Sequence, residues 1–373
     1  MDFLLEGIKN ITWQQAVMYV VGIILIILAI KKNLEPSLLL PMGFGAIIVN
    51  LPLSGVINQG SGENEVVGAI QWLFETGIGA SEILPLLLFI GIGAMIDFGP
   101  LLSNPKLIFI GAAAQFGIFF TMVVASACGF DIADAASIGI IGAADGPTSI
   151  LVSQVLKSKY VGAIAVAAYC YMALVPMIQP IVIKSITTKK ERRIKMEYNP
   201  KSVSKATKII FPIVVTIIAG LIAPASVSLV GFLMFGNLIR ECGVLDSLSD
   251  TASNILSNLI TLLLGITISF SMKAEEFVTP ETLMIIGLGL VAFVFDTFGG
   301  VMFVKFLNLF SKKKINPMVG AAGISAFPMA SRVVQKLGVQ EDPTNHLLMH
   351  AASANVAGQI ASVVAGGVIL GLL

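Results

Sequence analysis

The chain is dominated by apolar segments, most of them close to the length needed to cross a lipid bilayer. Twelve follow one another, near residues 16–31, 37–53, 83–98, 105–128, 134–156, 161–183, 209–223, 226–240, 255–271, 281–310, 316–337 and 345–370. A spanning helix needs roughly 20 apolar residues. With 56% hydrophobic and 12% charged residues, the 373-residue chain has too little polar surface for a water-soluble body. The sequence predicts an all-α polytopic membrane protein and excludes a soluble enzyme.

The charge balance excludes a second class of protein. The formal net charge is +1, so the chain has no basic face for binding the phosphates of a nucleic acid. The first apolar segment ends in Lys31-Lys32 and not in a small-residue cleavage site, so we expect it to remain as a membrane helix.

Two of the twelve segments differ in kind from the others. Segments 134–156 and 316–337 are rich in Gly, Ala and Ser, and each carries a proline, Pro147 or Pro328, near its middle. Proline removes a backbone donor and breaks a helix. Broken backbone at membrane depth is tolerated only where it lines a cavity within the protein. We therefore expect both segments to be broken or re-entrant helices that line a site.

Weak internal similarity relates the two halves of the chain. GIGAMIDFGPLLSNP at 91–105 resembles GITISFSMKAEEFVTP at 265–280, and GAADGP at 142–147 resembles GISAFP at 323–328. The matches recur in the same order, which indicates a first membrane repeat at 1–183 and a second at 209–373. The two are joined by a basic loop at 184–208.

The basic clusters give the orientation of the chain. The loop 184–208 holds nine Lys and Arg, which places it in the cytoplasm. If all twelve segments cross, the repeats are parallel and Lys31-Lys32 lies outside. If 134–156 and 316–337 are hairpins, each half crosses about five times and the repeats are inverted. Because it places every basic cluster in the cytoplasm, we favour this second arrangement, in which the two broken elements meet near the midplane.

Asp145 is the main candidate for chemistry in the first broken segment. A carboxylate at the bilayer centre costs about 2.5–3.5 kcal/mol on insertion scales, so it is seldom found there without a partner or a task. Neighbouring hydroxyls and the carbonyls freed at the helix break would suit Na+ or a proton. The alternative is structural: Asp145 caps the following half-helix, with Pro147 in its first turn.

The second broken segment has no carboxylate but offers Asn316, Ser325 and Arg332. Arg332 keeps its charge at every accessible pH, so it would mark an anion site or hold Asp145 ionised. It could equally be a positive-inside anchor. In segment 161–183, which follows the first broken segment, Tyr169 and Tyr171 interrupt a run of small and aliphatic residues, and one phenol could face the cavity.

Several motifs resemble one family. They are ADGPT at 144–148, AAYCYMALVP at 167–176, FGNLIRECGV at 235–244, and KINP at 314–317 running on to MASRV at 329–333. Together they closely resemble the beta subunit of the biotin-dependent, sodium-pumping decarboxylases of oxaloacetate, methylmalonyl-CoA, glutaconyl-CoA and malonate. The resemblance covers nearly the whole chain.

The resemblance implies roles for six residues. Asp145 would bind Na+, with Asn316 and Ser325 as further ligands. Tyr171 and Ser325 would serve in Na+ binding or proton delivery, and Asn316 and Gly320 would shape the second hairpin. Arg332 would face carboxybiotin from the cytoplasmic side.

The resemblance also implies an activity and partners. The subunit would decarboxylate carboxybiotin in the bacterial plasma membrane, export Na+ and consume a proton. The chain has no Met-Lys-Met biotinylation sequence, so biotin must come from a partner. The implied partners are a biotin carrier, a carboxyltransferase alpha subunit, a small single-span membrane subunit and further copies of this chain. An Na+-coupled carboxylate transporter is the rival function, and a purely structural membrane anchor is a weaker one.

Overall fold

The computed structural model describes residues 10–32, 35–59, 66–80, 82–196 and 203–373. These residues are helical almost throughout and contain no β-strand. The long helices are α2 (Trp13–Lys32), α11 (Val161–Ile186), α13 (Lys205–Ile222), α14 (Val227–Cys242), α18 (Pro280–Phe310) and α21 (Leu348–Leu372). The shorter helices are α3 (Pro36–Val49), α4 (Ala69–Phe74), α5 (Ile83–Met95), α6 (Gly99–Ser103), α7 (Ile108–Ala114), α8 (Phe116–Ala127), α9 (Ile132–Gly139), α10 (Gly146–Val155), α12 (Lys189–Arg192), α15 (Asp246–Asp250), α16 (Ser257–Ile268), α17 (Ala274–Phe277), α19 (Met318–Ala321) and α20 (Met329–Glu341).

The described helices confirm an all-α polytopic membrane fold. Eight stretches are long and apolar enough to cross a membrane: Trp13–Lys31, Pro105–Ala127, Val161–Ile186, Lys205–Ile222, Pro224–Cys242, Asp246–Met272, Pro280–Phe310 and Leu348–Leu372. Two further predicted crossings form the shorter helices α3, of 14 residues, and α5, of 13 residues. Every predicted segment outside the two broken ones is therefore helical.

The first broken segment is a re-entrant hairpin. After α9 and a 3-10 turn, the helix stops at Ala144, whose φ of 52° is left-handed, and α10 begins at Gly146. The two open ends of the hairpin come back together, because the Ser158 hydroxyl donates to Asp134 Oδ1 at 2.6 Å.

The second broken segment is also a hairpin. It is formed by α19, a non-helical stretch and α20, which starts directly after Pro328. Asn316 before it and Asn345 after it both donate their side-chain amides to the carbonyl oxygens of Arg192 and Ile194. Both open ends therefore meet at one short loop.

The two hairpins enter from opposite ends of the molecule and touch at their tips. Helix α11 begins at Val161, beside the open ends of the first hairpin, and ends at Ile186, close to the loop that holds the second. At 1.5 Å per residue its 26 residues extend about 39 Å, which exceeds the bilayer core of about 30 Å. Between the hairpins, the Ser325 N–H donates to the Ala143 carbonyl at 3.0 Å.

The outer helices pack reciprocally between the two halves. The third segment of the first half, α5, lies against the second segment of the second half, α14, and α3 lies against α16 in the same exchanged manner. A Cβ on Gly93 would collide with the Leu233 carbonyl, and one on Gly236 with that of Ile90, so α5 and α14 touch backbone to backbone. This exchange is what a two-fold relation between the halves would produce. The inverted repeat itself stays a prediction.

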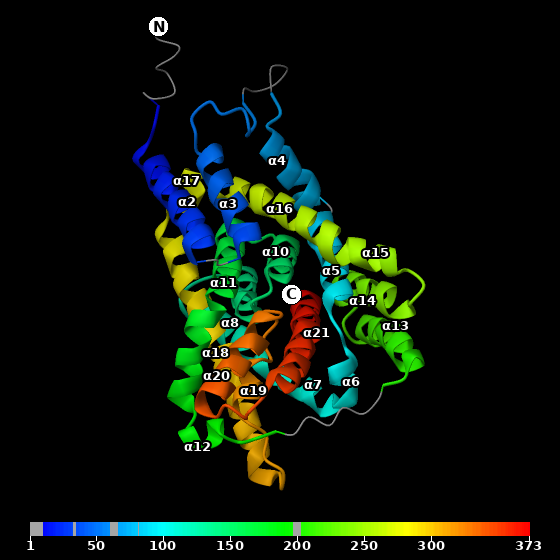
Figure 1. Ribbon diagram of the computed structural model, residues 1–373. Helices are drawn as coiled ribbons and strands as arrows, with labels where there is room; N and C mark the ends of the chain where they lie inside the picture. The colour runs from blue at the N-terminus through cyan, green and yellow to red at the C-terminus, as the bar shows by residue number, and fades with distance from the viewer. Residues whose placement is uncertain (1–9, 33–34, 60–65, 81, 197–202) are drawn as a thin grey trace.

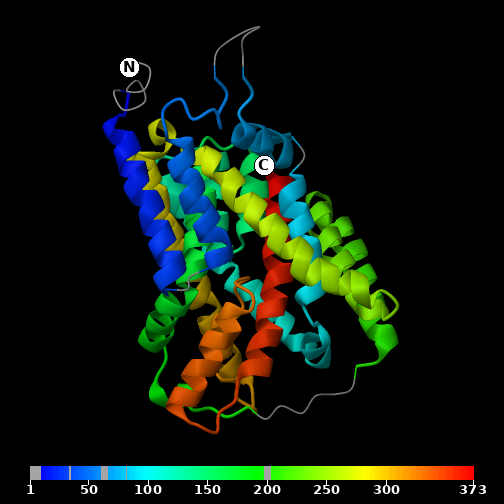
Figure 2. The same ribbon diagram turned by 45° about the horizontal axis from the view of Figure 1, so that its top comes forward.

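The ends of the chain and the basic clusters separate along the molecule. Figure 1 shows α2 running down from the upper end, and α12 with the end of α18 at the lower end. In the turned view of Figure 2, α21 rises toward the end where α2 begins. Helix α11 runs on to Ile186 and α13 begins at Lys205, so the predicted loop 184–208 contains the short helix α12.

Candidate functional site

Asp145 lies at the tip of the first hairpin and is 4% exposed. Its Oδ1 accepts the backbone N–H of Thr148 at 3.5 Å, and its Oδ2 accepts the Thr148 hydroxyl at 2.7 Å. The capping role considered from the sequence is therefore real, because the Thr148 N–H is a backbone donor that the start of α10 leaves without a partner in the helix.

Helix α21 supplies two further donors, which the sequence analysis did not identify. Gln359 Nε2 lies 3.1 Å and Ser362 Oγ 3.3 Å from Asp145 Oδ2. The available signal was a polar stripe of Asn355, Gln359 and Ser362, spaced by four and three residues along one face of an apolar helix. All donors to this carboxylate are neutral, and no Lys, Arg or His of the described chain forms an ion pair with it. The described residues therefore supply no countercharge for the carboxylate of Asp145.

Ser325 brings the second hairpin to the same place. Besides its N–H bond to Ala143, its hydroxyl donates to the Gly358 carbonyl in α21 at 3.2 Å. Asn355, one turn earlier in α21, donates to the carbonyl of Ile324 at 2.6 Å. Helix α21 thus holds both hairpin tips, and Ser325 and Asp145 line one cavity.

This cavity has a volume of about 900 Å³ and reaches from Asp145 to a charged rim. The rim carries Arg240 and the exposed carboxylates Asp246 and Asp250. Polar side chains of α16, among them Asn258 and Thr261, line part of the wall. A hydrated cation would therefore meet oxygen-bearing groups between the rim and the buried carboxylate.

The cavity opens on the side of the basic loop. Next to Arg240, Glu241 pairs with Lys208 at 3.4 Å, and Lys208, the last residue of that loop, lies in the first turn of α13. Lys208 also pairs with Asp97 at 3.3 Å. Burial alone would raise the pKa of Asp97, but the N–H of Gly99 and the Lys208 ammonium lower it overall, so the carboxylate stays charged.

Of the two tyrosines, the structure places Tyr169 in the cavity. Tyr169 is 2% exposed, its ring lies against Gly146, and its hydroxyl has no hydrogen-bond partner within the described chain. Tyr171 points elsewhere, and its hydroxyl donates to the Ile286 carbonyl of α18 at 2.5 Å. The family resemblance gives the role to Tyr171, whereas the geometry brings Tyr169 to the carboxylate.

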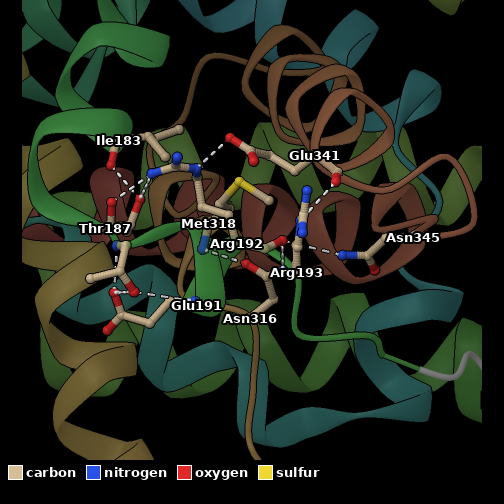
Figure 3. Close-up of polar contacts among 10 residues, drawn as sticks. Ile183, Thr187, Glu191, Arg192, Arg193, Asn316, Met318, Glu341 and Asn345 are labelled. Atoms are coloured by element: carbon tan, nitrogen blue, oxygen red, sulfur yellow. Dashed lines mark hydrogen bonds and ion pairs between the residues drawn. The ribbon is translucent and has the colours of Figure 1, made fainter.

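The remaining predicted residues lie away from Asp145. Asn316 is at the open end of the second hairpin, where Figure 3 shows its amide bound to the loop that carries Arg192. Gly320 packs so closely on Gly300 of α18 that a Cβ would collide with its carbonyl, so it does shape the hairpin. Arg332 is exposed on α20, and its guanidinium makes no hydrogen bond or ion pair with other described residues.

Arg192 fastens the loop to the second hairpin. Its Nε lies 2.6 Å from Glu341 Oε1 at the end of α20, and its Nη1 donates to the Thr187 carbonyl at 2.5 Å (Figure 3). Glu191 next to it pairs with Lys305 of α18 at 3.1 Å. Burial raises the pKa of Glu191, but the bonds from Thr188 and Lys305 lower it overall, which keeps this pair charged.

Two hairpins that meet tip to tip at a buried carboxylate, inside a bundle of membrane-spanning helices, define an ion-translocating membrane protein. Within that class, the chain belongs to the family described as Na+-transporting oxaloacetate decarboxylase beta subunit, which it matches over residues 14–373.

Curated relatives support the same assignment. The chain is 50% identical to the methylmalonyl-CoA decarboxylase subunit beta of Propionigenium modestum, covering 98% of this chain and 96% of the relative. It is 48% identical to the glutaconyl-CoA decarboxylase subunit beta of Acidaminococcus fermentans, covering 99% and 96%. It is 43% identical to the probable oxaloacetate decarboxylase beta chain of Vibrio cholerae, covering 98% and 96%. The chain is therefore an integral membrane subunit of a bacterial Na+-transporting decarboxylase, and this function is favoured over a secondary carboxylate transporter.

Proposed function

We propose that this subunit decarboxylates carboxybiotin presented by a partner and uses the released free energy to export Na+ while consuming one proton. The observation that carries the proposal is the junction of the two hairpin tips. There a buried carboxylate with only neutral donors faces a cavity that opens on one side of the protein. The relatives' names supply the chemistry that this junction would serve.

In this proposal Na+ binds at Asp145, with the hydroxyl oxygens of Thr148 and Ser325 as neutral ligands. Hard cations prefer oxygen ligands, and carbonyls freed at a helix break are a recurring source of them in transporters. Asn316, which the resemblance implies as a further ligand, acts here from a distance by fixing the open end of the second hairpin. Gly320 fixes the same hairpin by its contact with α18.

Carboxybiotin is an anion and approaches from the basic side of the protein. The exposed Arg332 meets its carboxylate, since the Arg332 guanidinium is free of other contacts within the described chain. The bond between the carboxyl carbon and the ureido nitrogen breaks, CO2 leaves, and the nitrogen keeps the electron pair and takes up a proton. Tyr171 positions α11 against α18 through its bond to the Ile286 carbonyl, whereas Tyr169 is the phenol beside Asp145.

The biotin comes from a carrier protein or domain, loaded by a carboxyltransferase alpha subunit that selects the acid. A small single-span membrane subunit and further copies of this chain complete the assembly. The chain's own lack of a biotinylation sequence supports a carrier supplied in trans.

The test uses purified protein in sealed vesicles, with radioactive sodium uptake and CO2 release both driven by free carboxybiotin. We expect Asp145→Asn and Arg332→Ala to abolish both activities. Two matched controls should keep them: Asp131→Asn, which alters the equivalent capping residue of α9, and Lys336→Ala, which removes an exposed cation one turn beyond Arg332.

Two results would contradict the proposal. Sodium-dependent uptake of an intact carboxylate without CO2 release would make the protein a secondary transporter. Full decarboxylation by Asp145→Asn would leave only an anchoring role for the hairpin tips.

A further inference from the structure

A second cavity, of about 620 Å³, lies between α7 and the last turns of α18, away from the site described above. Four lysines line it, Lys106, Lys195, Lys313 and Lys314, and none of its lining residues in the described chain is acidic. The rest of its wall is largely apolar. We call this cavity the basic groove.

Charged and apolar groups follow the same order on both walls of the groove. On the wall formed by α7, Lys106 comes before Phe109 in the chain, at the start of the apolar segment. On the wall formed by α18, Lys313 comes after Phe303 and Phe310, at the end of the apolar segment. The lysines therefore lie at the outer end, where the apolar segments begin and end, and the aromatic side chains lie further in. Phe303 and Phe310 are seven residues apart, so the apolar wall of α18 is about 10 Å deep.

The groove has unbalanced positive charge and open apolar surface. Lys195 is paired with Asp342 at 3.3 Å, and the Lys314 ammonium donates to a backbone carbonyl at the end of α18. Lys106 and Lys313 are exposed and form no ion pair with other described residues. Phe109 and Phe310 are 63% and 77% exposed, so apolar ligands can reach the wall from the side.

We propose that the basic groove binds an anionic phospholipid. Its phosphate lies among the lysines and its acyl chains follow the aromatic wall between α7 and α18. Basic pockets between membrane helices bind acidic headgroups, and the depth of this apolar wall gives the chains a matching surface. A soluble partner would reach only the rim and leave the apolar wall uncovered. The groove is separate from Asp145, so this inference does not depend on the proposed function.

Lipid selectivity at the groove can be measured by fluorescence quenching. The full-length chain carries Phe310→Trp as the reporter, with Trp13→Phe and Trp72→Phe to remove the other tryptophans, in vesicles that contain brominated lipid. We expect brominated phosphatidylglycerol to be preferred over brominated phosphatidylcholine by a factor of about five or more. This is the contribution of one lysine near an anionic headgroup.

Three triple variants separate a site from general surface charge. Replacing Lys106, Lys313 and Lys314 with Gln should reduce the preference to about one, and replacing the same three with Arg should retain it, which shows that the fold is intact. The matched control Lys184→Gln, Lys189→Gln and Lys190→Gln removes three exposed charges from the basic loop 184–208, outside the groove, and it should keep the preference.

Four results would overturn the inference. The first is an equal affinity for both lipids in the parent protein, and the second is an equal loss of preference in the two Gln variants. The third is loss of the preference in millimolar inorganic phosphate, which indicates a free-anion site. The fourth is protection of Lys313 from amine labelling by the biotin carrier but not by phosphatidylglycerol, which indicates a protein-docking site.

Discussion

The Arg192–Glu341 pair gives a quantitative test of how the second hairpin is held. The two side chains are only 8% and 14% exposed, and their atoms lie 2.6 Å apart. Replacing Arg192 with Met keeps most of the apolar stem but leaves the Glu341 carboxylate buried without its cation. It also removes the bond to the Thr187 carbonyl.

Removing one partner of a buried ion pair costs about 3–5 kcal/mol. Because Glu341 keeps some contact with solvent, we expect the lower end of that range, about 3 kcal/mol, for Arg192→Met. The neighbouring Arg193 is an internal control: it is exposed, and among the described residues its side chain donates to the Glu341 carbonyl alone, at 3.1 Å. Arg193→Met should cost less than about 1 kcal/mol.

The assay is reversible unfolding in mixed micelles titrated with SDS, carried out as a double-mutant cycle. Glu341→Leu alone should lower the free energy of unfolding. The double variant Arg192→Met/Glu341→Leu should regain much of the stability that each single variant loses, because replacing both members of a buried pair with apolar groups is often nearly neutral. If Arg192→Met is no more destabilising than Arg193→Met, or if the two changes are additive, the pair does not fasten the hairpin.

Three further predictions follow from the geometry. Tyr169→Phe should leave stability unchanged or raise it by about 1 kcal/mol, because it removes a buried hydroxyl that has no partner in the described chain. Tyr171→Phe should lower stability by about 1 kcal/mol, because it removes the hydrogen bond to α18. Thermal melting of the two variants compares these effects. Gly236→Val should cost about 3 kcal/mol or more and reduce the folded yield on size exclusion, because its side chain would enter the backbone of α5. In a cysteine-free background, Lys159→Cys and Lys336→Cys should react with an impermeant maleimide from opposite sides of sealed vesicles, and labelling from the same side would contradict the hairpin arrangement.

The membrane segments and their two breaks could be predicted because their causes are local. Apolar length identifies a spanning helix, and proline within a stretch of small residues identifies a break. The structure places the breaks at Ala144 and directly before Pro328, as the prolines predicted. The sequence left twelve crossings as an alternative, and the contacts between Asp134 and Ser158 decide in favour of a hairpin for the first segment.

Side chains that meet through tertiary contacts could not be assigned in the same way. Gln359 and Ser362 donate to a carboxylate more than 200 residues earlier, and nothing near Asp145 in the sequence indicates them. Tyr169 and Tyr171 differ by two positions on one helix, about 200° apart around its axis, so composition cannot tell which one faces the cavity. Asn316 was expected at the ion, but its distance from the tip depends on how the hairpin is inserted.

One-sided access to Asp145 has a mechanistic consequence. A passage open from end to end would let Na+ return down its gradient, and each ion would then dissipate about 2.3 kcal/mol per 100 mV. The cavity reaches the carboxylate from the basic side, while the opposite side is occupied by the first hairpin, whose open ends are joined through Asp134. If Na+ binds at Asp145 as proposed, its release to the other side requires the tips to move relative to the outer helices. The close backbone contact of α5 with α14 favours those helices as the fixed frame. The backbone bond between Ser325 and Ala143, which joins the two tips in the described chain, is a contact that such a movement would have to change.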